Sequence, residues 1–101
     1  MTEAELQAQI IPLANSYGLL VFHSGDSRRD TGRGFPDLTI ASKHGLMYRE
    51  LKDDHGDLSS AQATWKWTML ASGTNWGLWR PIDWRSGAIE AELRGWSDDR
   101  G

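Results

Sequence analysis

The sequence contains no cysteine, few prolines and no long apolar run. Without cysteine, neither a disulfide framework nor a thiolate metal site can form, and this absence favours an intracellular protein. No apolar run approaches the roughly 20 residues that a membrane-spanning helix needs. The first residues, MTEAE, lack the basic segment of a signal peptide. We therefore expect a soluble, cytoplasmic protein with no membrane partner.

Positive charge is also scarce, but it is unevenly distributed. The formal net charge is −3, from 11 basic and 14 acidic residues. This balance argues mildly against DNA binding, because affinity for the phosphate backbone comes from cations. Arg28, Arg29 and Arg33 nevertheless gather before Asp37, while acidic residues collect at 53–57. We expect a local basic rim on an acidic molecule.

The length of 101 residues predicts one domain spanning residues 1–101, with a frayed tail at 95–101. Apolar periodicity predicts a helix, three strands, a helix, a strand and a helix, and therefore an α/β fold. The continuous apolar run at 19–23 suits a buried central strand. The other elements are expected at 2–16, 34–40, 46–52, 59–72, 76–80 and 86–93.

Two of these strands carry a pair of carboxylates and a lysine. The polar turn at 42–45 is short enough to form a hairpin that brings Asp37 towards Glu50. Because strand side chains alternate, Glu50 and Lys52 share one face. Carboxylate oxygens suit Mg²⁺, which activates water and neutralises a phosphate under attack. An isolated Glu-x-Lys sequence is usually a surface ion pair on an edge strand and is by itself a weak signal.

The order of four short motifs resembles the VRR-NUC branch of the PD-(D/E)XK nucleases, above all its small stand-alone phage and bacterial members. The motifs are GFPDL at 34–38, ELK at 50–52, LSSAQ at 58–62 and WRPID at 79–83. None is specific singly, whereas their combination is. The resemblance implies a restriction-endonuclease-like αβββαβ core, in which helices flank a mixed sheet and the site lies at one edge.

This resemblance implies a structure-selective DNA endonuclease that hydrolyses phosphodiester bonds, with Holliday junctions as one candidate substrate. Asp37, Glu50 and the carbonyl of Leu51 would hold Mg²⁺, with Mn²⁺ as a substitute, and Lys52 would activate water. The expected partners are branched DNA and a second copy of the chain. The alternatives are a nuclease of other specificity, such as flap or nick processing, and a non-catalytic nucleic-acid-binding module.

Several further residues each have a functional and a structural interpretation. Glu3 and Gln7 match the spacing of an accessory acid and glutamine in the resembling family, although a carboxylate also suits the positive end of a helix. Gln62 either caps its helix with Ser59 or reaches the metal site. His23 either contacts substrate phosphate or closes its strand through a structural hydrogen bond.

Arg28, Arg29 and the tryptophans also each have a functional and a structural interpretation. Arg28 and Arg29 resemble a Ser-Arg-Arg segment of the family and would bind phosphate through their guanidinium groups. They could equally be solvated loop residues whose charge is offset by neighbouring acids. The 6 tryptophans supply either core or a subunit interface.

Overall fold

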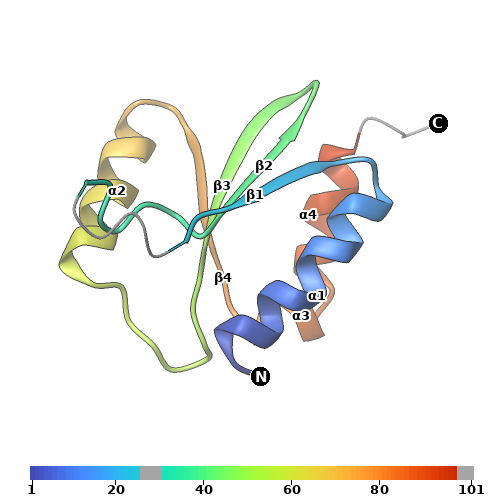
Figure 1. The fold of residues 1–101 in the computed structure, drawn as a ribbon, viewed down its shortest axis with the longest axis horizontal. Helices are drawn as coiled ribbons and strands as arrows, with labels where there is room; N and C mark the ends of the chain where they lie inside the picture. The colour runs from blue at the N-terminus through green and yellow to red at the C-terminus, as the bar shows by residue number, and fades with distance from the viewer. Residues whose placement is uncertain (26–30, 98–101) are drawn as a thin grey trace.

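The computed structural model describes residues 1–25 and 31–97, and it shows a mixed sheet with helices on both faces (Figure 1). The α2 helix lies on one side of the sheet, while α1, α3 and α4 lie together on the other. In chain order the elements are α1 (Glu3–Ser16), β1 (Leu20–His23), β2 (Leu38–Ser42), β3 (Gly45–Leu51), α2 (Ser60–Ala71), β4 (Asn75–Trp79), α3 (Pro81–Arg85) and α4 (Ala88–Trp96). The predicted α/β class is confirmed.

The four strands lie in the order β1-β2-β3-β4. The pairs β1–β2 and β2–β3 are antiparallel, and the predicted hairpin joins β2 to β3 through a turn at 43–44. The pair β3–β4 is parallel. A parallel pair requires a crossover connection, and α2 forms it.

The hydrophobic core fills the space between the sheet and the helices α1, α3 and α4, and we call this side of the sheet the core face. Helical spacing brings Leu6, Ile10 and Ala14 of α1 onto it. Ile89 and Leu93 of α4 point inward, as predicted. The strands contribute alternate residues to this core, among them Leu38, Ile40, Met47 and Leu51. None of the helices within the described ranges has the length and apolar character to cross a membrane.

Several sequence-based expectations about the elements are wrong. The strand expected at 34–40 is found at Leu38–Ser42, and α4 continues through Trp96, into the segment that was expected to fray. The first strand is an edge strand and not a central one, and Leu20 and Phe22 are 74% and 64% exposed. An apolar run of this length does not distinguish a strand buried on both faces from an edge strand with one uncovered face. Pro81, expected only to end β4, also begins the additional helix α3, because proline is favoured at the first position of a helix.

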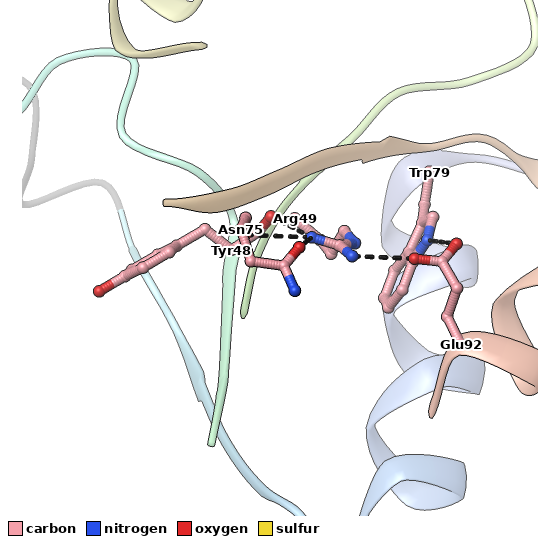
Figure 2. A network of polar contacts seen from close by, with 5 residues as sticks. All are labelled: Tyr48, Arg49, Asn75, Trp79 and Glu92. Carbon is pink, nitrogen blue, oxygen red and sulfur yellow. Dashed lines mark hydrogen bonds and ion pairs between the residues drawn. The ribbon is translucent and has the colours of Figure 1, made fainter. Parts of the chain in front are cut away.

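A buried arginine joins β3 to β4 and α4 on the core face (Figure 2). Arg49 is 5% exposed and lies in β3. Its Nη1 donates to the Tyr48 carbonyl at 2.9 Å and to the carbonyl and Oδ1 of Asn75 at 3.2 and 3.0 Å. Its Nη2 donates to a Glu92 carboxylate oxygen at 2.8 Å. The charge is therefore paired and hydrogen-bonded, as a buried cation must be.

Trp79 and Gly77 of β4 complete this network. The indole N–H of Trp79 donates to the second Glu92 oxygen at 2.9 Å, and the guanidinium carbon of Arg49 lies 5.2 Å from the centroid of the Trp79 ring. A Cβ atom at Gly77 would lie only 2.9 Å from Nε of Arg49. The absence of a side chain at Gly77 thus makes room for the guanidinium group.

We predict that Glu92→Ala lowers the free energy of unfolding by about 3 kcal/mol, because it leaves the buried Arg49 charge without its counter-charge. Glu90→Ala is the matched control. It removes an exposed ion pair with Arg94 on the same helix and a long hydrogen bond of 3.3 Å from the Tyr17 hydroxyl, so it should lower stability by only about 1 kcal/mol. Urea unfolding of both variants measures the difference, and equal losses would contradict a structural role for the Arg49 network.

Candidate active site

Asp37 and Glu50 lie opposite each other at the open end of the β2–β3 hairpin, away from its turn. The register pairs Leu38 with Arg49, so the next pair outward is Asp37 with Glu50. Residues that are directly opposite in an antiparallel pair point to the same face, with Cβ atoms about 5 Å apart. That face is the one next to α2, which we call the α2 face. The predicted approach of the two carboxylates follows from this register.

Backbone contacts on both sides fix Asp37. Its Oδ2 accepts a hydrogen bond from the Leu51 N–H at 2.8 Å. Its carbonyl accepts from the Ser24 N–H at 3.0 Å, which continues the pairing of β1 with β2. The Asp37 carboxylate is therefore anchored at the end of β3, beside the backbone of Leu51.

Glu50 is 1% exposed and is held by α2. Its Oε2 accepts from Nε2 of Gln62 at 2.8 Å. The other end of the same amide, Oε1 of Gln62, accepts from the Ser59 N–H at 2.9 Å, and Oγ of Ser59 accepts from the Gln62 N–H at 3.2 Å. The two interpretations of Gln62 are thus compatible, because a single side chain completes the capping box and contacts Glu50.

Gly34 allows the loop before Asp37 to touch the first turn of α2. Its φ of +86° suits glycine, and a Cβ atom there would lie 2.4 Å from the carbonyl carbon of Ala61 and 2.6 Å from the nitrogen of Gln62. No side chain fits into that space. The contact sets the height of α2 above the sheet and therefore the position of Gln62 over Glu50.

An aromatic cluster beside the carboxylates joins the same three segments. The ring of Phe35 packs edge-on against Tyr48 of β3 at 5.7 Å and against Trp65 of α2 at 5.0 Å. The indole N–H of Trp65 donates to the Arg33 carbonyl at 2.9 Å. Such edge-to-face pairs add to the free energy of burial and fix relative orientation. Trp65 therefore serves the packing of α2.

Lys52 follows β3 and is half-buried. Its N–H donates to the Trp79 carbonyl at 3.1 Å, so the parallel pairing continues through Lys52. Alternation then places its side chain on the α2 face with Glu50, as the sequence predicts. Its stem lies along the following turn, where a Cβ atom at Gly56 would be 3.5 Å from Cδ of Lys52.

The acidic turn after Lys52 is tied to the end of β4 and to α3. Asp53 accepts from the N–H groups of His55 and Gly56, and these two hydrogen bonds lower the pKa of its carboxyl group. Asp54 accepts from Arg85 at 2.9 Å and from the Ile82 N–H at 3.0 Å. The hydrogen bond from Arg85 is the main cause of a lowered pKa of Asp54. The turn is thus held in place and not merely solvated.

The remaining site candidates lie on α1 and β1 or outside the described residues. Thr2 and Glu5 form the predicted capping box, and Glu3 is exposed in the first turn of α1, on the helix that covers the core face. His23 is exposed and pairs with Leu38, which places its side chain on the core face. Arg28 and Arg29 lie outside the described residues.

The donor atoms of the pair suit a hard divalent cation. Residues 1–25 and 31–97 contain no group of three or more His, Cys, Asp and Glu side chains that would hold a metal. Mg²⁺ commonly binds through one or two carboxylates and keeps several waters, so a pair is sufficient. Asp37 and Glu50 supply oxygen ligands alone, and the hydrogen bond from Leu51 to Asp37 brings the Leu51 backbone beside them. These residues fit Mg²⁺ or Mn²⁺.

Comparisons of the chain with models of protein families, with curated proteins and with solved structures gave no match.

We predict that Asp54→Asn lowers the melting temperature at pH 7, because asparagine loses the ion pair with Arg85. The folded carboxyl has a pKa below its usual value of 3.8, so the stability that it contributes is present above pH 3.8 and is lost as the pH falls through the folded pKa. The difference from the wild type should therefore shrink in acid. Asp57→Asn, in the exposed part of the same turn, is the control, and a pH-independent difference for Asp54→Asn would contradict the ion-pair explanation.

Proposed function

We propose that this protein is a metal-dependent, structure-selective DNA endonuclease that hydrolyses phosphodiester bonds. The observation that supports the proposal is the pairing of Asp37 with Glu50 on adjacent strands, at the mouth of the hairpin. Like charges directly opposite each other destabilise a sheet. A bound divalent cation would reverse this repulsion, and phosphate chemistry is the usual work of Mg²⁺ held by carboxylates.

We also propose that the chain has a restriction-endonuclease-like fold and belongs to the VRR-NUC nucleases. The element order from α1 to β4 is compatible with a restriction-endonuclease-like αβββαβ core. The four motifs shared with VRR-NUC nucleases support the same assignment. In the structure, three of them meet, since Gly34 touches the first turn of α2 and Gln62 contacts Glu50.

Each residue has a defined task in this mechanism. When bound, Mg²⁺ would lower the pKa of its water and neutralise charge on the phosphate. Asp37, Glu50 and the Leu51 carbonyl would hold the cation, while Gln62 keeps the Glu50 carboxylate in one orientation. The ammonium group of Lys52 would orient the attacking water or stabilise the charge that develops on the phosphate oxygens. Glu3 is proposed as an accessory acid.

We predict that cleavage of a panel of branched, flap and linear DNAs requires Mg²⁺ or Mn²⁺. Asp37→Asn and Glu50→Gln should abolish both cleavage and metal binding, because each removes a ligand charge. Calorimetric titration of the protein with Mn²⁺ measures metal binding separately from turnover. Robust cleavage in excess chelator would end the proposal. Metal-independent DNA binding without cleavage would instead favour the non-catalytic module.

We predict that Lys52→Ala lowers the single-turnover rate about 10²-fold or more while DNA affinity stays nearly unchanged, since the charge acts on the transition state. Lys43→Ala is a matched control, because Lys43 lies in the turn at the opposite end of the same hairpin. Single-turnover kinetics and binding to uncleaved DNA separate the two quantities. A similar loss for both variants would show that Lys52 has no special role.

We also propose that the protein acts as a homodimer. Paired cuts in a four-way junction require two sites related by two-fold symmetry, which an isologous dimer provides. The tryptophans do not form one exposed patch for this purpose, since Trp79 is buried and Trp65 packs on Phe35. The edge strand β1, by contrast, exposes Leu20 and Phe22 and pairs only with β2 within the described sheet. Antiparallel pairing of β1 with its copy would satisfy the unpaired backbone groups of this edge.

We predict twice the chain mass in light scattering, and symmetric paired nicks in a junction. Phe22→Glu should yield monomers, because it places a charge in the apolar contact. Ile82→Glu, which changes an equally exposed apolar residue on α3, should leave the mass unchanged. A wild-type monomer at micromolar concentration that nicks one strand only would move the function to flap or nick processing.

A further inference from the structure

One long segment of this acidic chain carries no carboxylate. The chain has 14 acidic residues, yet residues 58–82 contain neither Asp nor Glu. This segment forms α2 and β4. Of its two cations, Arg80 donates to the carbonyls of Asp53 and Gly56, which leaves Lys66 as the cation on the helix. The side chains of α2 and β4 themselves therefore contribute no negative charge that would repel a polyanion.

Lys66 lies between two indole rings on this surface. Its Nζ is 4.8 Å from the centroid of the Trp67 ring and 5.5 Å from that of Trp76. Packing of α2 on the sheet explains Trp76, which is half-buried in β4. Packing does not explain Trp67, which is 64% exposed. Other apolar side chains of this chain are also exposed, among them Leu20 and Phe22, but within the described ranges Trp67 is the exposed aromatic residue whose ring lies beside a cation.

The register places these residues close to the candidate active site. Leu78 of β4 pairs with Glu50, and Trp76 lies two residues earlier on the same strand, paired with Tyr48. The rise along a strand and the spacing between strands together put the Cα atoms of Trp76 and Glu50 about 8 Å apart. On α2, Lys66 is one helical turn beyond Gln62, which contacts Glu50. One nucleic-acid strand could therefore occupy both places.

We propose that Trp67, Lys66 and Trp76 bind an unpaired nucleotide of the substrate, next to the bond that is cut. The base stacks on the exposed indole ring of Trp67, and the ammonium group of Lys66 binds the adjoining phosphate. A paired base is already stacked within its duplex and offers no free face. The site therefore selects branched, flapped or gapped DNA over intact duplex. This inference rests on the proposed function for its substrate, but it concerns binding and not cleavage.

The test is the affinity of the full-length protein for labelled oligothymidine and for a blunt duplex of equal length, measured by fluorescence anisotropy in EDTA. Trp67→Ala should weaken oligothymidine binding about 10-fold and duplex binding less than about twofold. Trp67→Phe should restore most of the affinity, because phenylalanine still stacks. Lys66→Ala should reduce the slope of log affinity against log salt by about 0.7. Leu70→Ala, on the next turn of the same helix, is the control and should change nothing.

Two outcomes of the binding measurement overturn the inference. If Trp67→Ala leaves oligothymidine binding unchanged, or weakens both DNAs equally, no unpaired base stacks there. If it changes only the mass in light scattering, the surface is a subunit interface. Because the measurement contains no metal, the result is independent of catalysis. A protein that fails to cleave but binds oligothymidine through Trp67 would refute the endonuclease and keep the nucleotide site, whereas a cleaving protein indifferent to Trp67 would do the reverse.

Discussion

The register of the β2–β3 hairpin is the constraint on which both the core and the candidate site depend. With Leu38 opposite Arg49, the core residues Leu38, Ile40, Met47 and Leu51 face α1 and α4, while Asp37 and Glu50 face α2. A shift of one residue would turn every side chain of the shifted strand to the other face. It would bury a carboxylate in the core and expose Leu38 or Leu51. Burial of the apolar face therefore also holds the two carboxylates opposite each other.

Arg49 and Glu50 are adjacent in β3 but point to opposite faces of the sheet, one to the core and the other to the candidate site. Arg49 points into the core face, where Glu92 accepts from its Nη2 and the Asn75 carbonyl accepts from its Nη1. Glu50 points the other way and is contacted by Gln62, which lies on a helix with only one buried residue, Met69. The arginine fastens β3 to β4 and α4, so the strand that carries Glu50 is fixed from behind. The α2 face carries the carboxylate pair together with aromatic and aliphatic side chains, among them Tyr48 and Leu78.

The sequence was sufficient for the features that repeat locally. The capping boxes at Thr2 and Ser59, the hairpin turn and the helical stripe through Leu6 and Ile10 are all encoded within a few residues, and each is confirmed. The position of β1 at the sheet edge depends on which faces the helices cover, and local pattern carries no information on that. The α3 helix was missed because Pro81 both ends a strand and begins a helix.

The candidate site was partly predictable for the same reason. Strand alternation and the short turn were enough to bring Asp37 towards Glu50. The role of Arg49 was not predicted, since its partner Glu92 is 43 residues away and becomes a neighbour only in the folded sheet. Gly34 belongs to one of the four motifs, but its contact with Ala61 depends on how α2 packs. The local signal was a glycine directly before Phe-Pro, and glycine is common in turns of many kinds.

Because the Gln62 side chain contacts both Ser59 and Glu50, the stability of the first turn of α2 is coupled to the orientation of the Glu50 carboxylate. Fraying of the first helical turn would break the Ser59 cap and release Glu50 together, because both use the same amide group. By linkage, any ligand that prefers Glu50 in its held orientation also stabilises the start of α2. Binding of a ligand to the carboxylates would accordingly slow hydrogen exchange of the backbone amides of Gln62 and Ala63, which donate hydrogen bonds to Ser59.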